Sequence, residues 1–276
     1  MEKKKKTKIL TRVISSLIGF PIIVLILIFS NNIAMDIFVT LVALISMYEY
    51  FNCFKKSNTA NPSSWLGYLV AVTLSIMHIA EVSLLKSLYL VPIVLLILVI
   101  EMLFSKGKKN AMDILITAMG ICYIPGMLMF LSMIRADIPN GMLLVWYVFC
   151  AAWGSDVFAY FVGCKFGKHK FTEISPNKSI EGCVAGVVGA MVTALIVSFV
   201  ANRFFGAQVD YGIIVVIVAL LSIAGQIGDL FASSIKRYCG VKDYGDLIPG
   251  HGGMLDRIDS IIFILPFAYI LLNLIS

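Results

Sequence analysis

Long and almost uncharged apolar windows follow one another along this chain, and they constrain its fold more than any other feature. Each window holds about 20 residues, enough for a helix to cross a hydrocarbon layer of ~30 Å at 1.5 Å per residue. Only 14% of the 276 residues are charged, against roughly 25% in soluble globular domains. A water-soluble enzyme is therefore excluded, and we predict an all-α polytopic membrane protein.

The apolar windows predict about nine transmembrane helices, with boundaries that are soft by several residues. They span Val13–Ser30, Ile33–Phe51, Trp65–Ala80, Leu88–Phe104, Ala111–Met133, Met142–Gly163, Cys183–Phe204, Tyr211–Ser233 and Ile258–Ile275. The connecting loops are too short to fold separately. We therefore expect one membrane-embedded unit, with spans one to five in an N-terminal region (residues 1–135) and spans six to nine in a C-terminal catalytic region (residues 136–276).

Lysine and arginine are distributed unevenly between the two sides that nine spans create. The side that holds the N-terminus carries 19 of the 22 Lys and Arg residues, and the other side carries only Lys86, Arg135 and Arg203. Cytoplasmic loops have the excess of positive charge. We therefore expect a multi-pass protein of the cell membrane with a cytoplasmic N-terminus and a C-terminus on the opposite side. The basic segment before the first span favours an uncleaved signal anchor.

Two loops on the expected cytoplasmic side are longer than the others, at residues 164–182 and 234–257. Each mixes Lys, carboxylate, His, Gly and Pro. Glycine lets the backbone approach a ligand closely, and beside lysines it lets the backbone present amides to phosphate. The alternative is a pair of flexible solvated loops near anionic headgroups. The carboxylates that accompany these loops favour a ligand site.

Asp229 lies late in the eighth window, where an ionisable side chain is costly and by default indicates function. Ser233, Lys236 and Arg237 follow at i+4, i+7 and i+8, so a helix would place all four residues on one face. A carboxylate is thus predicted one to two turns below two cations at the cytoplasmic end of the helix.

Asp256 and Asp259 are spaced i and i+3 at the start of the ninth window. Together with Asp229 they would bring three carboxylates into one interface between adjacent helices. Such an oxygen-rich site suits Mg²⁺, which prefers carboxylate, water and substrate phosphate. The alternative is a set of ion pairs in which each Asp is neutralised by Lys or Arg.

Other ionisable residues divide into two groups. Asp156, with Tyr160 one turn later, is a fourth candidate on the cytoplasmic side. His169 and His251 lie in the polar loops, where contact with phosphate or proton transfer is geometrically open to them. Residues near window ends in the N-terminal half lack a polar constellation, and we predict snorkelling or interhelical hydrogen bonds for them. These residues are Asp36, Glu49, His78, Glu101 and Asp113.

Fixed-spacing motifs fill the C-terminal half. Residues 233–259 read S-x-I-K-R-x₄-K-D-x-G-x₂-I-P-x-H-G-G-M-x-D-R-I-D, and further motifs occupy residues 155–160, 163–170 and 174–182. In these motifs the chain resembles the CDP-diacylglycerol synthase family, also called phosphatidate cytidylyltransferase. The close resemblance covers roughly residues 151–260, whereas the N-terminal half matches in hydropathy alone.

The resemblance implies a Mg²⁺-dependent membrane enzyme that works as a homodimer. It would transfer CMP from CTP to phosphatidate, giving CDP-diacylglycerol and pyrophosphate for phospholipid biosynthesis. A second, monovalent cation such as K⁺ is also implied. The expected partners are CTP, phosphatidate and the lipid bilayer, with no nucleic acid.

The motif positions define the expected site residues. The expected catalytic residues are Asp229, Asp256, Lys236, Arg237, Lys242, Asp243, His251 and Arg257. The expected substrate contacts are Asp156, Tyr160, Lys168, Ser175, Lys178, Ser179, Glu181, Ser233, Gly252 and Gly253. The expected metal ligands are Asp229, Asp256 and Asp259.

Two other functions are compatible with the residues. A transporter for a small anion would use similar glycines and intramembrane carboxylates, but the repeated halves common in transporters are not visible here. A CTP-using lipid-alcohol kinase would also hold CTP and Mg²⁺ at the cytoplasmic side of the membrane. The kinase differs from the cytidylyltransferase in the phosphorus atom that is attacked, so isotopic labelling of CTP separates the two.

Overall fold

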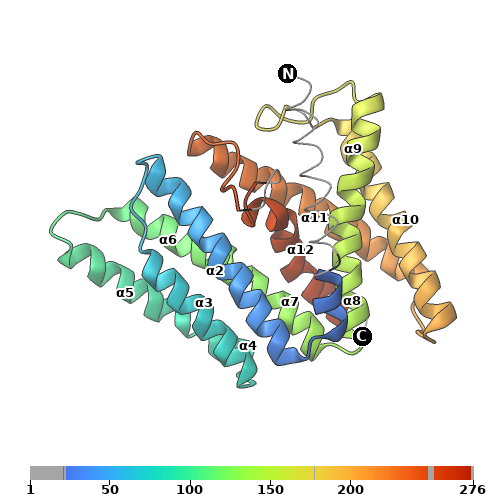
Figure 1. Ribbon diagram of the computed structural model, residues 1–276, viewed down its shortest axis with the longest axis horizontal. Helices are drawn as coiled ribbons and strands as arrows, with labels where there is room; N and C mark the ends of the chain where they lie inside the picture. Colours follow the sequence, from blue (N-terminus) through green and yellow to red (C-terminus); the bar gives the residue numbers. More distant parts are fainter. Residues whose placement is uncertain (1–20, 22, 177, 248–251, 275–276) are drawn as a thin grey trace. The chain divides into compact units, whose positions relative to one another are not determined.

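The computed structural model describes all residues except 1–20, 22, 177, 248–251 and 275–276. Throughout the described part the regular elements are helices, which confirms the expected all-α class. The helices are α2 (Asn32–Lys56), α3 (Ser64–Ile79), α4 (Leu84–Ser87), α5 (Leu90–Phe104), α6 (Ala111–Tyr123), α7 (Pro125–Asp137), α8 (Gly141–Phe149), the π-helical turn η1 (Cys150–Gly154), α9 (Ser155–Phe166), α10 (Ile180–Phe204), α11 (Tyr211–Tyr238) and α12 (Leu255–Asn273) (Figure 1).

Six helical segments among the described residues are long and apolar enough to cross a membrane. They are Asn32–Lys56, Leu84–Phe104, Ala111–Asp137, Gly141–Phe166, Ile180–Phe204 and Tyr211–Tyr238, and each overlaps one of the expected spans. α3 and α12 overlap two further windows but are not among the six. Half of the expected first span (residues 13–20 and 22) lies outside the described residues. The multi-pass character is therefore supported, and the count of nine stays a prediction.

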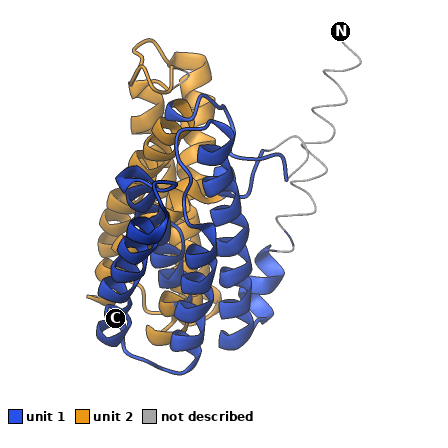
Figure 2. Ribbon diagram, turned by 90° about the vertical axis from the view of Figure 1, so that its left-hand side faces the viewer, with its two compact units in different colours: residues 1–132, 238–257 blue, residues 133–237, 258–276 orange. Residues whose placement is uncertain are grey.

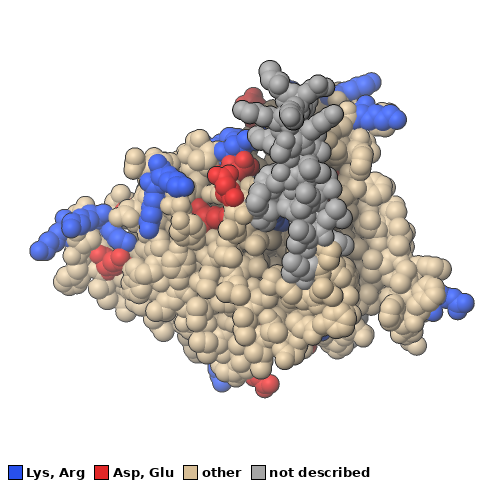
Figure 3. Space-filling model, viewed as in Figure 1, with Lys and Arg blue, Asp and Glu red and all other residues tan. Residues whose placement is uncertain are grey.

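Large apolar side chains are exposed on many of these helices. Phe104 is 81% exposed, Leu96 61% and Val184 61%. On the face drawn in Figure 3, wide areas carry no charged side chains of Lys, Arg, Asp or Glu. Exposed apolar surface of this extent is unusual for a soluble monomer, and it fits helices that face hydrocarbon.

The chain forms two compact units, which Figure 2 shows in different colours. Unit 1 comprises Met1–Ser132 and Tyr238–Arg257, and unit 2 comprises Met133–Arg237 and Ile258–Ser276. The second polar loop is thus part of the same unit as the N-terminal helices. The boundary that we expect after residue 135 separates an N-terminal region from a C-terminal catalytic region by function. It stays a prediction.

Within unit 1, glycines bring α3 and α6 close to α2. A Cβ atom at Gly67 would lie 2.8 Å from the ring of Phe51, and one at Gly120 would lie 2.7 Å from the ring of Tyr50. Small residues at such contacts let membrane helices pack closely. Tyr50 and Phe51 are each 1% exposed. This end of α2, which includes the neighbouring Glu49, is therefore firmly packed.

Within unit 2, glycines also set the spacing between α11 and α12. A Cβ atom at Gly225 would lie 2.7 Å from Ile264, and one at Gly228 would lie 2.6 Å from Phe263 and 3.0 Å from the carbonyl oxygen of Asp259. The two helices therefore lie side by side, as the sequence predicts.

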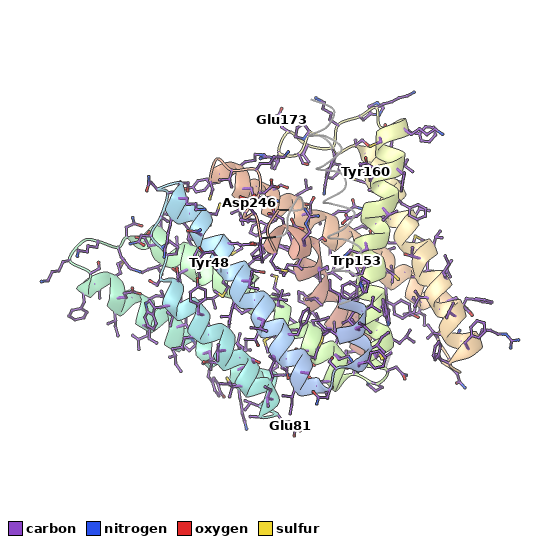
Figure 4. The ribbon with its side chains drawn as sticks, in the orientation of Figure 1. Tyr48, Glu81, Trp153, Tyr160, Glu173 and Asp246 are labelled. Atoms are coloured by element: carbon purple, nitrogen blue, oxygen red, sulfur yellow. The ribbon has the colours of Figure 1, made fainter. Side chains whose placement is uncertain are left out.

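The long segment Gly141–Phe166 contains the π-helical turn η1 immediately before Ser155 and Asp156. Single π-helical turns inside α-helices occur frequently at functional sites. Gly154 at its end packs against α10, where an added Cβ atom would lie 3.3 Å from the Cα of Ala190. Figure 4 labels Trp153 within this turn and Tyr160 on α9.

Helices extend further into the second polar loop than hydropathy predicts. The expected loop spans residues 234–257, whereas α11 continues to Tyr238 and α12 begins at Leu255. Charged side chains such as Lys236 lower the hydropathy but do not break a helix. The helix ends just before Gly240, whose φ of 68° is the left-handed conformation that glycine adopts readily after a helix.

Candidate active site

The loop between α9 and α10 is held by its own backbone and carries several of the predicted substrate contacts. Lys170 and Ser179 form an antiparallel bridge, and the Phe171 amide donates to the Lys178 carbonyl at 2.9 Å. Ser179 caps α10 because its hydroxyl oxygen accepts the Gly182 amide hydrogen at 3.1 Å. The loop thus presents Lys178 directly before a helix N-terminus.

Glu181, in the first turn of α10, fastens the start of this loop. Its carboxylate accepts hydrogen bonds from the backbone amides of Lys168 at 3.2 Å and His169 at 3.3 Å. It also lies 2.6 Å from Nδ1 of His169, whose side chain is 75% exposed. Negative charge is favourable at this end of a helix. Glu181 therefore orders the loop, and a direct contact between Glu181 and substrate stays a prediction.

Asp229 of α11 forms an ion pair with Lys178. Each of the two side chains is 28% exposed, so both remain accessible to a polar ligand. The structure thereby brings together a predicted metal ligand and a predicted phosphate contact that are far apart in the sequence.

A second ion pair joins α11 to α12. The ammonium nitrogen of Lys236 lies 3.8 Å from a carboxylate oxygen of Asp259, and the two side chains are 10% and 8% exposed. A buried charge needs such a partner. Ion pairing, the alternative that the sequence leaves open, is therefore present at Asp229 and at Asp259.

Asp256, in the first turn of α12, is bonded to the loop that precedes it. Its Oδ2 atom accepts the Tyr244 amide at 2.8 Å and the Gly253 amide at 3.0 Å. Gly252 has a φ of 87°, and a Cβ atom there would lie 3.2 Å from the same oxygen. Asp256 thus ties together two parts of the second polar loop (residues 234–257), which we call the signature loop. His251, an expected catalytic residue, lies outside the described residues.

Glu49 of α2 contacts the signature loop, although sequence reasoning gave it only a structural role. Its carboxylate accepts the amide hydrogens of Met254 at 2.9 Å and Leu255 at 2.8 Å. Glu49 is 4% exposed. Its partners are 205 and 206 residues away along the chain, and no local pattern in the sequence connects them.

The remaining predicted residues are mostly on the surface. Asp156 and Tyr160 lie one turn apart on an exposed face of α9, and Figure 4 labels Tyr160. Other exposed residues are Lys168, Arg237, Lys242, Asp243 and Arg257. Ser175, Ser233 and Gly252 are half-buried, and Gly253 is buried.

Among the described residues, no three His, Cys, Asp or Glu side chains form a group that could hold a metal ion. Asp229 and Asp259 belong to unit 2, and Asp256 belongs to unit 1. The donor chemistry nevertheless fits Mg²⁺, because this ion is usually held by one or two protein carboxylates together with water and substrate phosphate. Joint coordination of one ion by these aspartates stays a prediction.

Comparison with known proteins gives one consistent result. A sequence model of the cytidylyltransferase family matches residues 10–275. A phosphatidate cytidylyltransferase of Staphylococcus haemolyticus is 33% identical over 275 residues, which are 97% of this chain and 98% of that protein. One from Staphylococcus aureus is 34% identical over the same shares. One from Bacillus subtilis is 45% identical over 137 residues, 49% of each chain.

Proposed function

Because the chain belongs to the cytidylyltransferase family, we propose that it is an integral-membrane phosphatidate cytidylyltransferase. It transfers CMP from CTP to phosphatidate and forms CDP-diacylglycerol and pyrophosphate. The similarity to phosphatidate cytidylyltransferases over 97% of the chain carries this proposal. The apolar helices support a membrane enzyme, which a lipid substrate requires.

The ion pairs suggest how the chain handles two polyanionic substrates. A phosphatidate oxygen attacks the α-phosphorus of CTP, and the bond from that phosphorus to the pyrophosphate oxygen breaks. Lys178 and Lys236 are cations that already lie beside carboxylates. When phosphate enters, Lys178 would leave Asp229 and neutralise phosphate charge. Positioning and charge neutralisation supply most of the lowering of the barrier in such reactions.

Asp229 and Asp256 would hold Mg²⁺, which supplies charge neutralisation and orientation of the phosphates when bound. Asp259 is buried and paired with Lys236, so it would reach the ion only if that pair opened. A monovalent cation such as K⁺ and a homodimeric state complete the proposal, and both rest on the family resemblance.

Isotopic labelling of CTP tests the reaction. With purified protein, phosphatidate and Mg²⁺, we expect label from [α-³²P]CTP in the lipid phase and label from [γ-³²P]CTP in pyrophosphate. A lipid kinase would place the γ label in lipid instead. A transporter would leave both labels in nucleotide, and either of these results would refute the proposed function.

The proposal also requires the active site to face the cytoplasm, where CTP is present. To test this, exposed Cys122 and Cys164 are first replaced by serine. We expect Gln208→Cys, on the loop before α11, to react with a membrane-impermeant thiol reagent in intact cells. Glu173→Cys, in the loop between α9 and α10 (Figure 4), should react only after the cytoplasmic face is opened. The reverse pattern would place the site on the wrong side.

A further inference from the structure

The carboxylate of Glu49 occupies a position that a helix-capping group usually fills. Met254 directly precedes α12 and Leu255 is its first residue, and their amides donate to the two oxygens of Glu49. The first amides of a helix have no partner within the helix, and the positive end of the helix dipole favours an anion there. A residue of α2 thus caps a helix that begins 206 residues later.

Two glycines let the loop close around this carboxylate. A Cβ atom at Gly245 would lie 2.7 Å from an oxygen of Glu49, and one at Gly253 would lie 2.5 Å from the other oxygen. A Cβ atom at either position would therefore force the carboxylate of Glu49 to move. The carboxylate of Glu49 therefore gives a steric reason for glycine at both positions, in addition to any role of these glycines in letting the backbone approach substrate.

The contacts of Glu49 adjoin those of Asp256. Three consecutive amides are divided between two carboxylates: the Gly253 amide donates to Asp256, whereas the Met254 and Leu255 amides donate to Glu49. Leu255 is bonded covalently to Asp256. A backbone held at Leu255 thus fixes the position and direction from which the Asp256 side chain extends.

We propose that Glu49 is a positioning residue of the active site. Its carboxylate holds the first turn of α12, and thereby holds the Asp256 side chain in the position that the reaction requires. This inference rests on the proposed function. It extends the catalytic machinery to an N-terminal helix outside the signature motifs. Glu49 itself need not touch either substrate, since it acts through Met254 and Leu255.

The test compares Glu49→Gln and Glu49→Asp with Asp113→Asn as a matched control. Asp113 is also a buried carboxylate of unit 1, 3% exposed. It accepts two backbone amides, those of Asn61 at 2.6 Å and Asn110 at 2.8 Å, but these belong to loops without any predicted site residue. A purely structural role would give Glu49→Gln and Asp113→Asn the same effects.

Two measurements are made on protein in detergent. We expect Glu49→Gln to lower kcat at least tenfold with KM for CTP changed less than threefold, and Asp113→Asn to leave kcat within threefold of wild type. Glu49→Asp, which keeps the charge, should recover part of the lost kcat. Hydrogen exchange in the peptide containing Met254 and Leu255 should accelerate at least tenfold in Glu49→Gln but not in Asp113→Asn.

Unchanged exchange in that peptide, or a kcat for Glu49→Gln equal to that of Asp113→Asn, would overturn the inference. If Glu49→Gln does not fold, Gly245→Ala displaces the carboxylate while keeping Glu49, and it should produce the same accelerated exchange and lowered kcat. Slow exchange with unchanged kcat in Gly245→Ala would again overturn the inference. Failure of wild-type protein to form CDP-diacylglycerol would instead refute the proposed function, while the exchange data would still decide whether Glu49 holds the loop.

Discussion

Asp256→Asn and Asp229→Asn are each expected to lower kcat for CDP-diacylglycerol formation at least 100-fold, a loss of about 2.7 kcal/mol of transition-state stabilisation. The proposed function assigns both carboxylates to Mg²⁺. An asparagine removes the negative charge that attracts the ion but keeps the size of the side chain. The measurement is the steady-state rate with [α-³²P]CTP at saturating phosphatidate.

Asparagine is the informative substitution at position 256 because it preserves the loop. The amide oxygen of Asn can accept the hydrogen bonds of Tyr244 and Gly253 that Asp256 Oδ2 accepts. The fold of the signature loop should therefore survive while the charge is lost. Equal thermal stability of the variant and the wild type in detergent would verify this.

Asp246→Asn is the matched control, since Asp246 is an exposed carboxylate of the same loop (Figure 4). It removes the same charge a few residues away and should leave kcat within threefold of wild type. If Asp256→Asn or Asp229→Asn kept more than about a tenth of the activity, a loss below ~1.4 kcal/mol, that aspartate would not be a metal ligand. The role of that aspartate would then be the ion pair that the sequence leaves open as an alternative.

Elements of the fold that depend on local sequence could be predicted. Apolar windows locate the membrane helices because a helix in lipid needs a continuous apolar surface, and each of the six candidate spans overlaps an expected window. Helical spacing also predicts that Lys236 continues the face of Asp229. This prediction is confirmed as far as α11 runs unbroken to Tyr238, past the point where hydropathy alone would end it.

Contacts between distant segments could not be predicted in the same way. Nothing near Lys178 in the sequence identifies Asp229 as its partner, and nothing near Glu49 identifies Met254. A carboxylate close to the end of an apolar window has the same local pattern whether it snorkels to the headgroups or caps another helix. Only the path of the chain decides, and that path depends on close packing at glycines such as Gly67 and Gly120.

Lys178→Ala is expected to lower the rate of CTP turnover far more than Lys168→Ala or Lys170→Ala. Lys178 forms the ion pair with Asp229, whereas Lys168 and Lys170 are exposed. A lysine that merely attracts the loop to anionic headgroups is worth about 1 kcal/mol and is weakened by salt. If Lys178 contacts phosphate in the closed site, its removal should cost at least 50-fold in kcat/KM and depend little on salt.

Two further variants separate a phosphate contact from a structural ion pair. Lys178→Arg should restore little activity, because a planar guanidinium does not replace a compact ammonium. If the pair with Asp229 served stability alone, removing both charges in Lys178→Met with Asp229→Asn should restore activity, since neither half-buried side chain would then be left as an unpaired charge. We expect the double variant to stay inactive, as the reaction needs both charges. Recovered turnover in that variant would make the pair purely structural, whereas equal and salt-sensitive losses for the alanine variants of all three lysines would return this loop to the role of a solvated surface.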